Sequence, residues 1–280
     1  MQAVHPIGPL ILSQSRTTFT FLVLLPILAL RLGWRRLRLP IVDAARIFLF
    51  GVLGVAASNY LYYLAIQRTN VATAIILQYT APIWVLLYMV ARSFQKPTLP
   101  RVAAVGLAVV GSALVVGLVG SGGFRLDPGG VAAALFAAFS FAFYNVLGHS
   151  ILIRHERWTV LLYTTCSASL FWMAVNPPWH IIAAHYSGAQ WLFLLVFSSI
   201  SSLAAFSFYF AGLQLLEPTR AIVVSCLEPV FAIGIAAIAL GELMRPLQAA
   251  GIALVLVATI VVQMPDRKAP GLSTAVEPME

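Results

Sequence analysis

The chain has 280 residues, of which 61% are hydrophobic and only 9% charged, with a mean hydropathy of +0.93. This composition excludes a soluble globular protein and predicts a chain surrounded by membrane lipid. The formal net charge of +8 would suit a nucleic-acid partner in a soluble protein. Here the basic residues gather in short loops between apolar stretches, so they indicate membrane topology and no nucleic-acid binding.

Nine apolar stretches are long enough to cross a bilayer, which takes about 20 residues per helix. They run at 9–30, 44–66, 70–91, 101–119, 129–151, 159–175, 189–214, 218–240 and 245–263. Backbone polar groups find no water in lipid, and these stretches are too long and too uniformly apolar for barrel strands. We therefore expect an all-α integral membrane protein with nine transmembrane helices.

Alternate loops carry most of the positive charge. Together with the C-terminal tail they hold 13 of the 17 basic residues: Arg31, Arg35, Arg36, Arg38, Arg46, Arg92, Lys96, Arg101, Arg154, Arg157, Arg220, Arg267 and Lys268. The loops of the other side hold Arg68, Arg125 and Arg245. Because cytoplasmic loops are rich in Lys and Arg, the pattern predicts a cytoplasmic C-terminus and an outside N-terminus in a bacterial-type plasma (inner) membrane.

The apolar pattern repeats at an offset of 147 residues. Phe50–Val115 overlays Phe197–Val262 without a gap, and this places Pro82 on Pro229. Tandem halves of several apolar segments are typical of membrane transporters. We therefore divide the chain into an incomplete first repeat, a linker loop, a second repeat and a disordered cytoplasmic tail, at 1–120, 121–128, 129–263 and 264–280.

One stretch has no counterpart. The stretch at 129–151, moved back by 147 residues, falls before Met1, so we expect two five-helix halves of which the first lacks its first helix. An odd number of helices per half predicts inverted orientations of the two halves. The first half should then leave an open groove that meets lipid, and transport by this chain should be weak or leaky.

Two charged residues lie inside apolar stretches and away from their ends, where charge is expensive and normally faces protein or a cavity. Glu228 is the acid nearest the middle of a stretch. It can bind a cationic solute group or exchange a proton, and the alternative is that it ties down a kinked helix by a hydrogen bond. Arg16 is the basic candidate, and it can also snorkel to the interface.

Pro82 and Pro229 occupy equivalent mid-stretch positions. A proline has no N–H, so each frees the carbonyl four residues earlier, at Gln78 and Ser225, and kinks its helix. Exposed backbone at membrane depth is tolerated where it lines a cavity. Both helices are therefore expected to border a central site, although plain packing kinks stay open as an alternative.

Polar and aromatic residues gather on these helices and their neighbours. The candidates for binding or coupling are Gln78, Tyr79, Ser225, Tyr144, Asn145, Asn59 and Tyr63, beside Glu228 and Arg16. Other members of the group are Tyr60, Tyr62, Gln67, Trp84, Trp172, Ser207, Tyr209 and Gln214. Cys166 and Cys226 read as small buried hydrophobes, and no histidine spacing indicates a metal. We expect no cofactor.

Several local patterns resemble the EamA branch of the drug/metabolite transporter superfamily. Leu227-Glu228-Pro229-Val230-Phe231, followed by Ala239-Leu240-Gly241-Glu242, is similar to that family's ninth helix. Phe143-Tyr144-Asn145 resembles its sixth helix, and Arg16 with Phe19 its second. The first repeat departs from this pattern, with Phe94-Gln95 where the second has Gly241-Glu242. The resemblance implies ten helices in two inverted repeats around a central cavity, and movement of small metabolites.

These features favour a secondary transporter, an exporter by alternating access, of small organic metabolites such as amino acids. A sugar-phosphate or nucleotide-sugar exchanger is an alternative, disfavoured because Arg16 is the only basic residue expected inside. A non-transporting membrane scaffold or a membrane enzyme is the alternative of another class. The enzyme is disfavoured because one mid-membrane acid with interfacial histidines makes no catalytic constellation. A homodimer is left open.

Overall fold

The computed structural model describes residues 9–116, 127–183, 186–240 and 245–264. Within these ranges the regular structure is helical, and nine helical units are long and apolar enough to span a membrane. They correspond to the nine predicted stretches, which confirms the all-α membrane fold. The predicted tail after Met264, most of the linker loop and the Gly241-Glu242 motif lie outside the described residues.

The first four spans are built from seven helical segments, and one further short helix, α2 (Trp34–Leu37), connects the first two spans. α1 (Pro9–Leu32) leads through α2 to a continuous span. That span comprises α3 (Ile41–Leu49), the π-helical segment η1 (Phe50–Ala56) and α4 (Ala57–Arg68). The third span is divided into α5 (Val71–Gln78) and α6 (Ala81–Ala91), and the fourth is α7 (Leu99–Val116).

The remaining spans begin with α8 (Pro128–Leu152) and α9 (Arg157–Val175), followed by the short α10 (Pro178–Ala183). The next span again contains a π-helical segment, in the order α11 (Gly188–Ser198), η2 (Ser199–Ala204), α12 (Ala205–Leu215). The eighth is again divided, into α13 (Pro218–Ser225) and α14 (Glu228–Leu240), and α15 (Pro246–Gln263) ends the bundle.

The element bounds repeat at the offset seen in the sequence. Adding 147 to Val71–Gln78 gives Pro218–Ser225, and adding it to Leu99–Val116 gives Pro246–Gln263. The π-helical segments and the divided spans also fall at equivalent places. Only α8, among the described spans, has no counterpart at this offset. The repeat is therefore present in the secondary structure as well as in the hydropathy.

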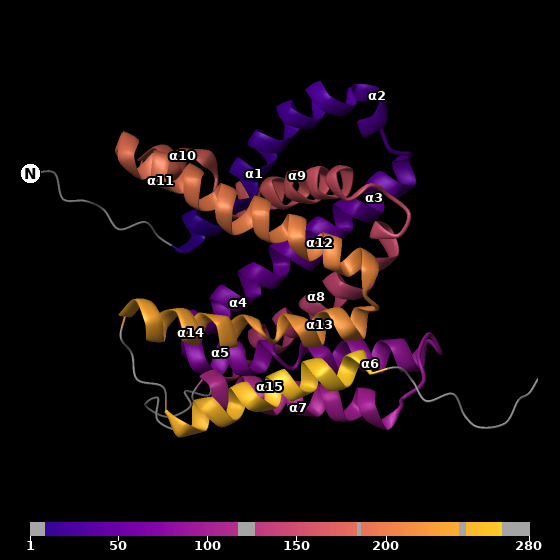
Figure 1. Ribbon diagram of the computed structural model, residues 1–280. Helices are drawn as coiled ribbons and strands as arrows, with labels where there is room; N and C mark the ends of the chain where they lie inside the picture. The colour runs from indigo at the N-terminus through magenta and orange to yellow at the C-terminus, as the bar shows by residue number, and fades with distance from the viewer. Residues whose placement is uncertain (1–8, 117–126, 184–185, 241–244, 265–280) are drawn as a thin grey trace, which may run out of the picture.

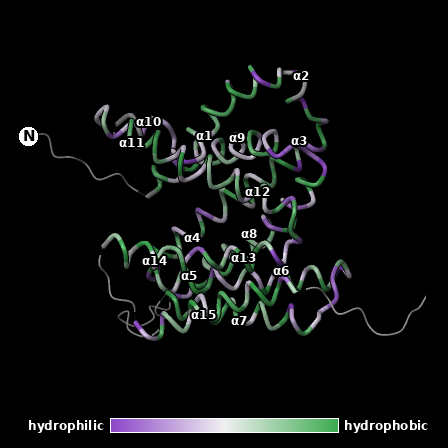
Figure 2. Tube along the Cα trace, in the orientation of Figure 1, coloured by the Kyte–Doolittle hydropathy of each residue, from purple (hydrophilic) through white to green (hydrophobic). Residues whose placement is uncertain are grey.

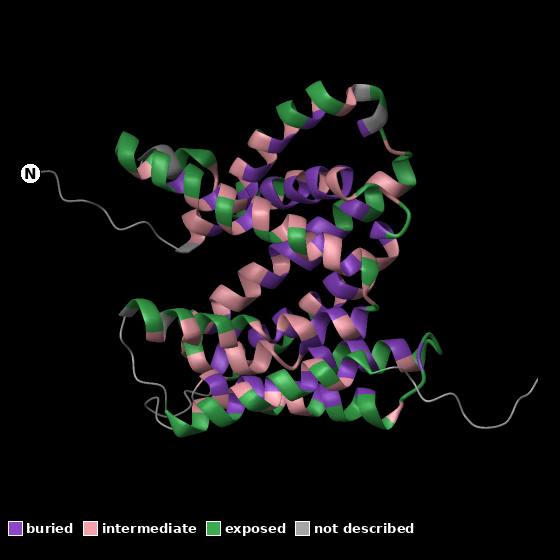
Figure 3. Ribbon diagram, viewed as in Figure 1, coloured by how far each residue is buried: buried purple, intermediate pink, exposed green. Residues whose placement is uncertain are grey.

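The helices form two groups with α4 and α8 between them (Figure 1). One group holds α1, α3, α9, α11 and α12, and the other holds α5, α6, α7, α13, α14 and α15. Hydrophobic residues run along most of each helix, and hydrophilic ones lie mainly near helix ends and in loops (Figure 2). Buried residues concentrate where helices meet (Figure 3).

Equivalent helices pack against each other at the crossing of α7 and α15. Gln248 near the start of α15 donates from Nε2 to the Val115 carbonyl near the end of α7, so the two helices are antiparallel. A Cβ on Gly251 would lie 2.7 Å from the Gly111 carbonyl oxygen and 2.7 Å from the Val115 nitrogen. Such close backbone approach needs small residues, as is usual between membrane helices.

The two ends of the bundle differ in charge. We call the end where α6 and α15 finish and α7 and α13 begin the basic end, because Arg92, Arg101 and Arg220 lie there. At the opposite end α7 and α14 finish and α15 begins.

The face that α8 covers in the first half has an uncovered equivalent in the second. α8 packs on α4, α5 and α6, and Ala81 and Val85 are buried there. Their equivalents at the 147-residue offset, Glu228 and Ala232, are exposed within the described structure. Glu228 and Ala232 line the central cavity, and the uncovered face continues along α12 and α14, where Phe208, Phe231 and Ile235 are exposed. The open groove expected in the first half stays a prediction.

Candidate functional site

A cavity of about 630 Å³ lies between the two groups of helices and takes its walls from both halves of the chain. The predicted residues on its wall are Arg16, Asn59, Tyr63, Gln78, Tyr79, Pro82, Tyr144, Ser225, Glu228 and Pro229. Val71, Val116 and Gln248 also line it, so the cavity extends toward the opposite end of the bundle. The structure thus brings all but one of the sequence-predicted site residues to one cavity.

Two divided spans meet the cavity at equivalent points. α5 ends at Gln78 and α6 begins at Ala81, while α13 ends at Ser225 and α14 begins at Glu228. Pro82 and Pro229 each occupy the first turn of the second piece, where a missing N–H costs little. The expected kink is thus a two-residue break just before each proline, and the cavity wall includes irregular backbone.

Glu228 is the first residue of α14, and its side chain is exposed on the cavity wall. The Tyr79 hydroxyl donates a hydrogen bond to Glu228 Oε2 at 3.3 Å. This contact joins the break of the first half to the break of the second. One hydrogen bond leaves most of the acceptor capacity of a carboxylate free for a solute.

Arg16 reaches the cavity from α1 but is tied to the π-helical segment η2. Its Nε donates to Ser202 Oγ at 3.0 Å, and its terminal Nη2 donates to the Ser201 carbonyl at 3.1 Å. Within this structure the side chain points into protein, so the snorkelling interpretation is not needed. The guanidinium keeps further N–H donors that can face the cavity.

The aromatic floor of the cavity is built around Tyr144 on α8. Its ring stacks on Phe50 at a centroid distance of 5.0 Å and on Phe141 at 5.9 Å. Asn145, the next residue, is fully buried and does not line the cavity. It accepts a hydrogen bond from the Tyr209 hydroxyl at 2.6 Å and donates to the Phe141 carbonyl. Asn145 therefore supports the floor from behind.

The remaining polar and aromatic residues also divide into those that line the cavity and those that pack elsewhere. Asn59 donates from Nδ2 to the Val55 carbonyl of η1 at 2.9 Å, and Ser225 donates to the Ile222 carbonyl at 2.7 Å. Tyr62 joins them on the wall, whereas Tyr60 packs edge-on against Phe171 and Trp172.

Sequence reasoning missed several apolar members of the wall, among them Ile75, Phe141, Phe206 and Cys226. Cys226 could have been found, because it is the residue equivalent to Tyr79 at the 147-residue offset. The others carry no signal that separates them from ordinary apolar helix residues.

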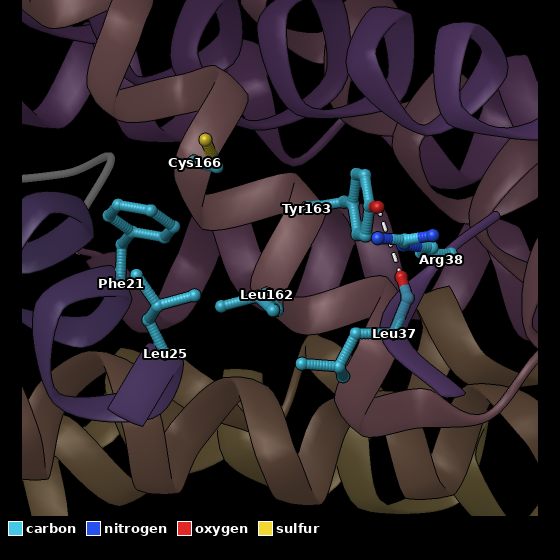
Figure 4. Close-up of a pocket in the computed structure, with 7 residues that line it drawn as sticks. All are labelled: Phe21, Leu25, Leu37, Arg38, Leu162, Tyr163 and Cys166. Carbon is cyan, nitrogen blue, oxygen red and sulfur yellow. Dashed lines mark hydrogen bonds between the residues drawn. The ribbon is translucent and has the colours of Figure 1, made fainter. Parts of the chain in front are cut away.

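A second, smaller cavity of about 240 Å³ lies between α1 and α9 (Figure 4). Its wall is mainly apolar, with Phe21, Leu25, Leu162 and Cys166. At one side the Tyr163 hydroxyl donates to the Leu37 carbonyl at 3.0 Å. None of the predicted site residues lies there. Among the described residues, no group of three or more His, Cys, Asp or Glu is placed to hold a metal.

The sequence model of the family described as "EamA-like transporter family" matches residues 1–117 and 128–264. The chain belongs to the EamA-like transporter family. As an EamA-family chain with nine apolar spans among its described residues, it is an integral membrane protein of a transporter family. The matched family agrees with the resemblance drawn from the Glu-Pro and Phe-Tyr-Asn motifs.

Two curated relatives have similar sequences. The "Uncharacterized inner membrane transporter YicL" of Salmonella typhimurium (strain LT2) is 22% identical over 228 residues, covering 81% of this chain and 75% of that protein. An "Uncharacterized transporter" of Archaeoglobus fulgidus is 23% identical over 214 residues, covering 75% of each. A solved structure described as "Crystal structure of protein" matches with a TM-score of 0.75 at 20% identity, over 93% of this chain and 88% of that one. That likeness concerns the fold alone.

Proposed function

We propose that this EamA-family chain is a secondary transporter that exports small organic metabolites, such as amino acids, by alternating access. The observation that carries the proposal is the cavity of about 630 Å³, which residues of both halves line. It combines two broken helices with one carboxylate and one guanidinium. Discontinuous helices at the interface of two repeats are how secondary transporters commonly form a solute site.

The polar groups of the wall suit a solute with both an amino and a carboxylate group. Glu228 offers a carboxylate for the ammonium, and Arg16 offers guanidinium N–H groups for the carboxylate. Tyr62, Tyr63 and Phe206 supply aromatic surface for the rest of the solute. Arg16 is the only basic side chain among the residues that line the cavity in the described structure, which fits a phosphorylated solute poorly.

Glu228 can also couple transport to a proton. It is the only carboxylate among the described lining residues, and a carboxylate that exchanges a proton as the solute binds would link the two movements. Facilitated diffusion without coupling fits the same cavity. The charge distribution further supports a basic end in the cytoplasm, with the cavity extending toward the outside.

A screen in proteoliposomes tests the function. Purified protein is reconstituted, and uptake and counterflow of radiolabelled amino acids, amines and sugar phosphates are compared with empty vesicles. We expect saturable movement of an amino acid or another zwitterion. Movement of sugar phosphates alone would replace the proposal by an exchanger, and no movement of any solute would contradict a transport function.

A cavity-filling variant makes the screen specific to this site. Ala232 lines the cavity on α14, and tryptophan there would occupy much of the space a solute needs. We expect Ala232→Trp to abolish the transport. The matched control is Ala103→Trp, because Ala103 is exposed on α7 and does not line the cavity. Equal transport by both variants would place the solute path elsewhere.

A further inference from the structure

A polar cluster joins the two halves at the basic end, away from the cavity wall. Glu217 Oε2 accepts hydrogen bonds from Gln95 Nε2 at 2.9 Å and from Arg101 Nη2 at 3.2 Å. Thr219 Oγ1 donates to Gln95 Oε1 at 2.8 Å. Gln95 and Arg101 belong to the first half, while Glu217 and Thr219 belong to the second. We call these four residues the basic-end clamp.

The clamp is held in place by its surroundings. Gln95 is 8% exposed, Arg101 7% and Thr219 0%, whereas the Glu217 side chain is 47% exposed, so three buried groups surround a carboxylate that solvent partly reaches. Gln95 follows the turn that ends α6, in which Ser93 has a positive φ of 58°. Such a backbone is unfavourable for serine and persists only when the surroundings impose it. The Phe94 and Gln95 nitrogens both donate to the Met89 carbonyl, which closes this turn.

The repeat gives the clamp residues equivalents at the opposite end. The residues equivalent to Glu217 and Arg101 are Asn70 and Gln248, which carry no charge, and the residue equivalent to Gln95 is Glu242, which lies outside the described residues. Asn70 caps α5 by accepting from the Thr73 nitrogen at 2.8 Å, and Gln248 donates to the Val115 carbonyl. A charge-assisted contact is stronger than a neutral one. Glu217 and Arg101 therefore supply a charge-assisted contact between the two halves at the basic end.

We propose that the basic-end clamp is a gate that keeps the basic end shut and biases the protein toward the conformation open at the opposite end. Opening the basic end separates the α6–α7 turn from the start of α13, so it breaks the contacts to Glu217. The inference rests on the proposed alternating access, since a protein with one conformation needs no gate. It assigns to Glu217 and Arg101 a role outside the solute site.

Accessibility of the native Cys226 thiol tests the gate. Cys226 is buried on the cavity wall, and Cys166→Ser leaves it as the sole cysteine. A membrane-impermeant maleimide is applied to each membrane face in turn. For Glu217→Gln we expect labelling from the basic-end face to rise about tenfold, as loss of a charged hydrogen bond implies, and labelling from the opposite face to fall.

Opposite changes on the two faces distinguish a shifted equilibrium from a loosened fold, which would raise labelling on both. Arg101→Met should have the same effect as Glu217→Gln, and the double variant should add little, because both break one contact. The matched control is Glu156→Gln, since Glu156 is also an acidic N-cap residue, that of α9. Unchanged labelling in Glu217→Gln, a rise on both faces, or an equal response in Glu156→Gln would each overturn the gate.

The labelling readout needs no solute, so it is independent of the transport screen. Face-specific changes without transport of any tested solute would retain the gate and refute the proposed solute class. Transport with unchanged labelling in the clamp variants would retain the transporter and refute the gate.

Discussion

Glu228 is the residue on which the proposed chemistry depends most. Its carboxylate lies on the cavity wall at the break of the eighth span and accepts from Tyr79. We expect Glu228→Gln to fold normally, because the amide keeps the shape and can still accept this hydrogen bond. Transport of a zwitterion should fall at least about tenfold, since a charged contact to the ammonium is lost.

The pH profile separates the functional and the structural interpretations of Glu228. A carboxylate that exchanges a proton makes transport depend on pH, and glutamine cannot titrate. Uptake is measured between about pH 5 and 8, with Tyr79→Phe as the control that removes the hydrogen bond but keeps the carboxylate. A pH profile that is the same in Glu228→Gln and the unmodified protein would support a purely structural residue.

Residue-level prediction from sequence succeeded where chemistry alone restricts position. A carboxylate or a proline in mid-span has few tolerated surroundings, so Glu228, Pro82 and Pro229 could be placed beside a cavity. Asn145 and Tyr60 could not, because their direction depends on neighbouring helices that periodicity does not identify. The clamp was missed for another reason: Gln95 and Glu217 lie at span ends, where polar residues are usual and indicate nothing.

Among the elements, the crossing of α7 and α15 gives the sharpest stability prediction. A Cβ on Gly251 would lie 2.7 Å from backbone atoms of Gly111 and Val115, and backbone cannot move aside as a flexible side chain can. We expect Gly251→Ala to destabilise the protein by about 1–3 kcal/mol. The measurement is thermal unfolding in detergent.

The control is Gly106→Ala on α7, the partner helix of the crossing, where a new Cβ would meet nothing within 4 Å. Alanine favours a helix over glycine by about 0.8–1 kcal/mol, so this variant should unfold at the same or a higher temperature. Equal destabilisation by both substitutions would mean that the close crossing does not limit stability.

The divided spans give a second prediction for an element. Pro229→Ala restores the N–H that can bond to the Ser225 carbonyl, and so favours a continuous helix through the break. We expect stability to be kept and transport to fall, because the irregular backbone on the cavity wall is lost. Pro246→Ala is the control, as Pro246 sits at the first position of the unbroken α15. Full activity in Pro229→Ala would show that the break is not needed.

The lengths of the apolar stretches were enough to predict the transmembrane helices. The nine predicted spans agree with the described helices to within a few residues. The π-helical segments η1 and η2 were not predicted. Whether a turn takes one residue more than an α-helix depends on packing against neighbours, and Phe50–Ala56 is as apolar as the α-helical residues around it. The breaks were predicted as kinks because proline position alone does not tell how many residues leave the helix.

For the whole molecule, the charge asymmetry predicts a cytoplasmic C-terminus. Arg92, Arg101 and Arg220 lie at the end of the bundle where α15 finishes. A fluorescent reporter that folds only in the cytoplasm should be bright when fused after the last residue. A periplasmic phosphatase reporter fused there should be inactive. The reverse pattern would show that the protein has the opposite orientation in the membrane, with the basic-end clamp on the outer face.

The uncovered face along α12 and α14 gives the second prediction at this scale. By the repeat, an apolar helix of about 20 residues should fit there as α8 fits on α4. Fusing such a helix ahead of residue 1, with its own start in the cytoplasm, should reduce solute leak and raise net transport in proteoliposomes. A polar helix of equal length is the control. No difference between the two fusions would mean that lipid suffices to cover this face.

The antiparallel crossing of α7 and α15 has a consequence for ancestry. Each helix is the counterpart of the other, so Gly111 against Gly251 and the equivalent pair Ala258 and Ala104 are two versions of one contact. A single-repeat ancestor would have made this contact between two identical copies inserted in opposite directions. After duplication and fusion the two contacts could change separately, and in this chain one consists of two glycines and the other of two alanines.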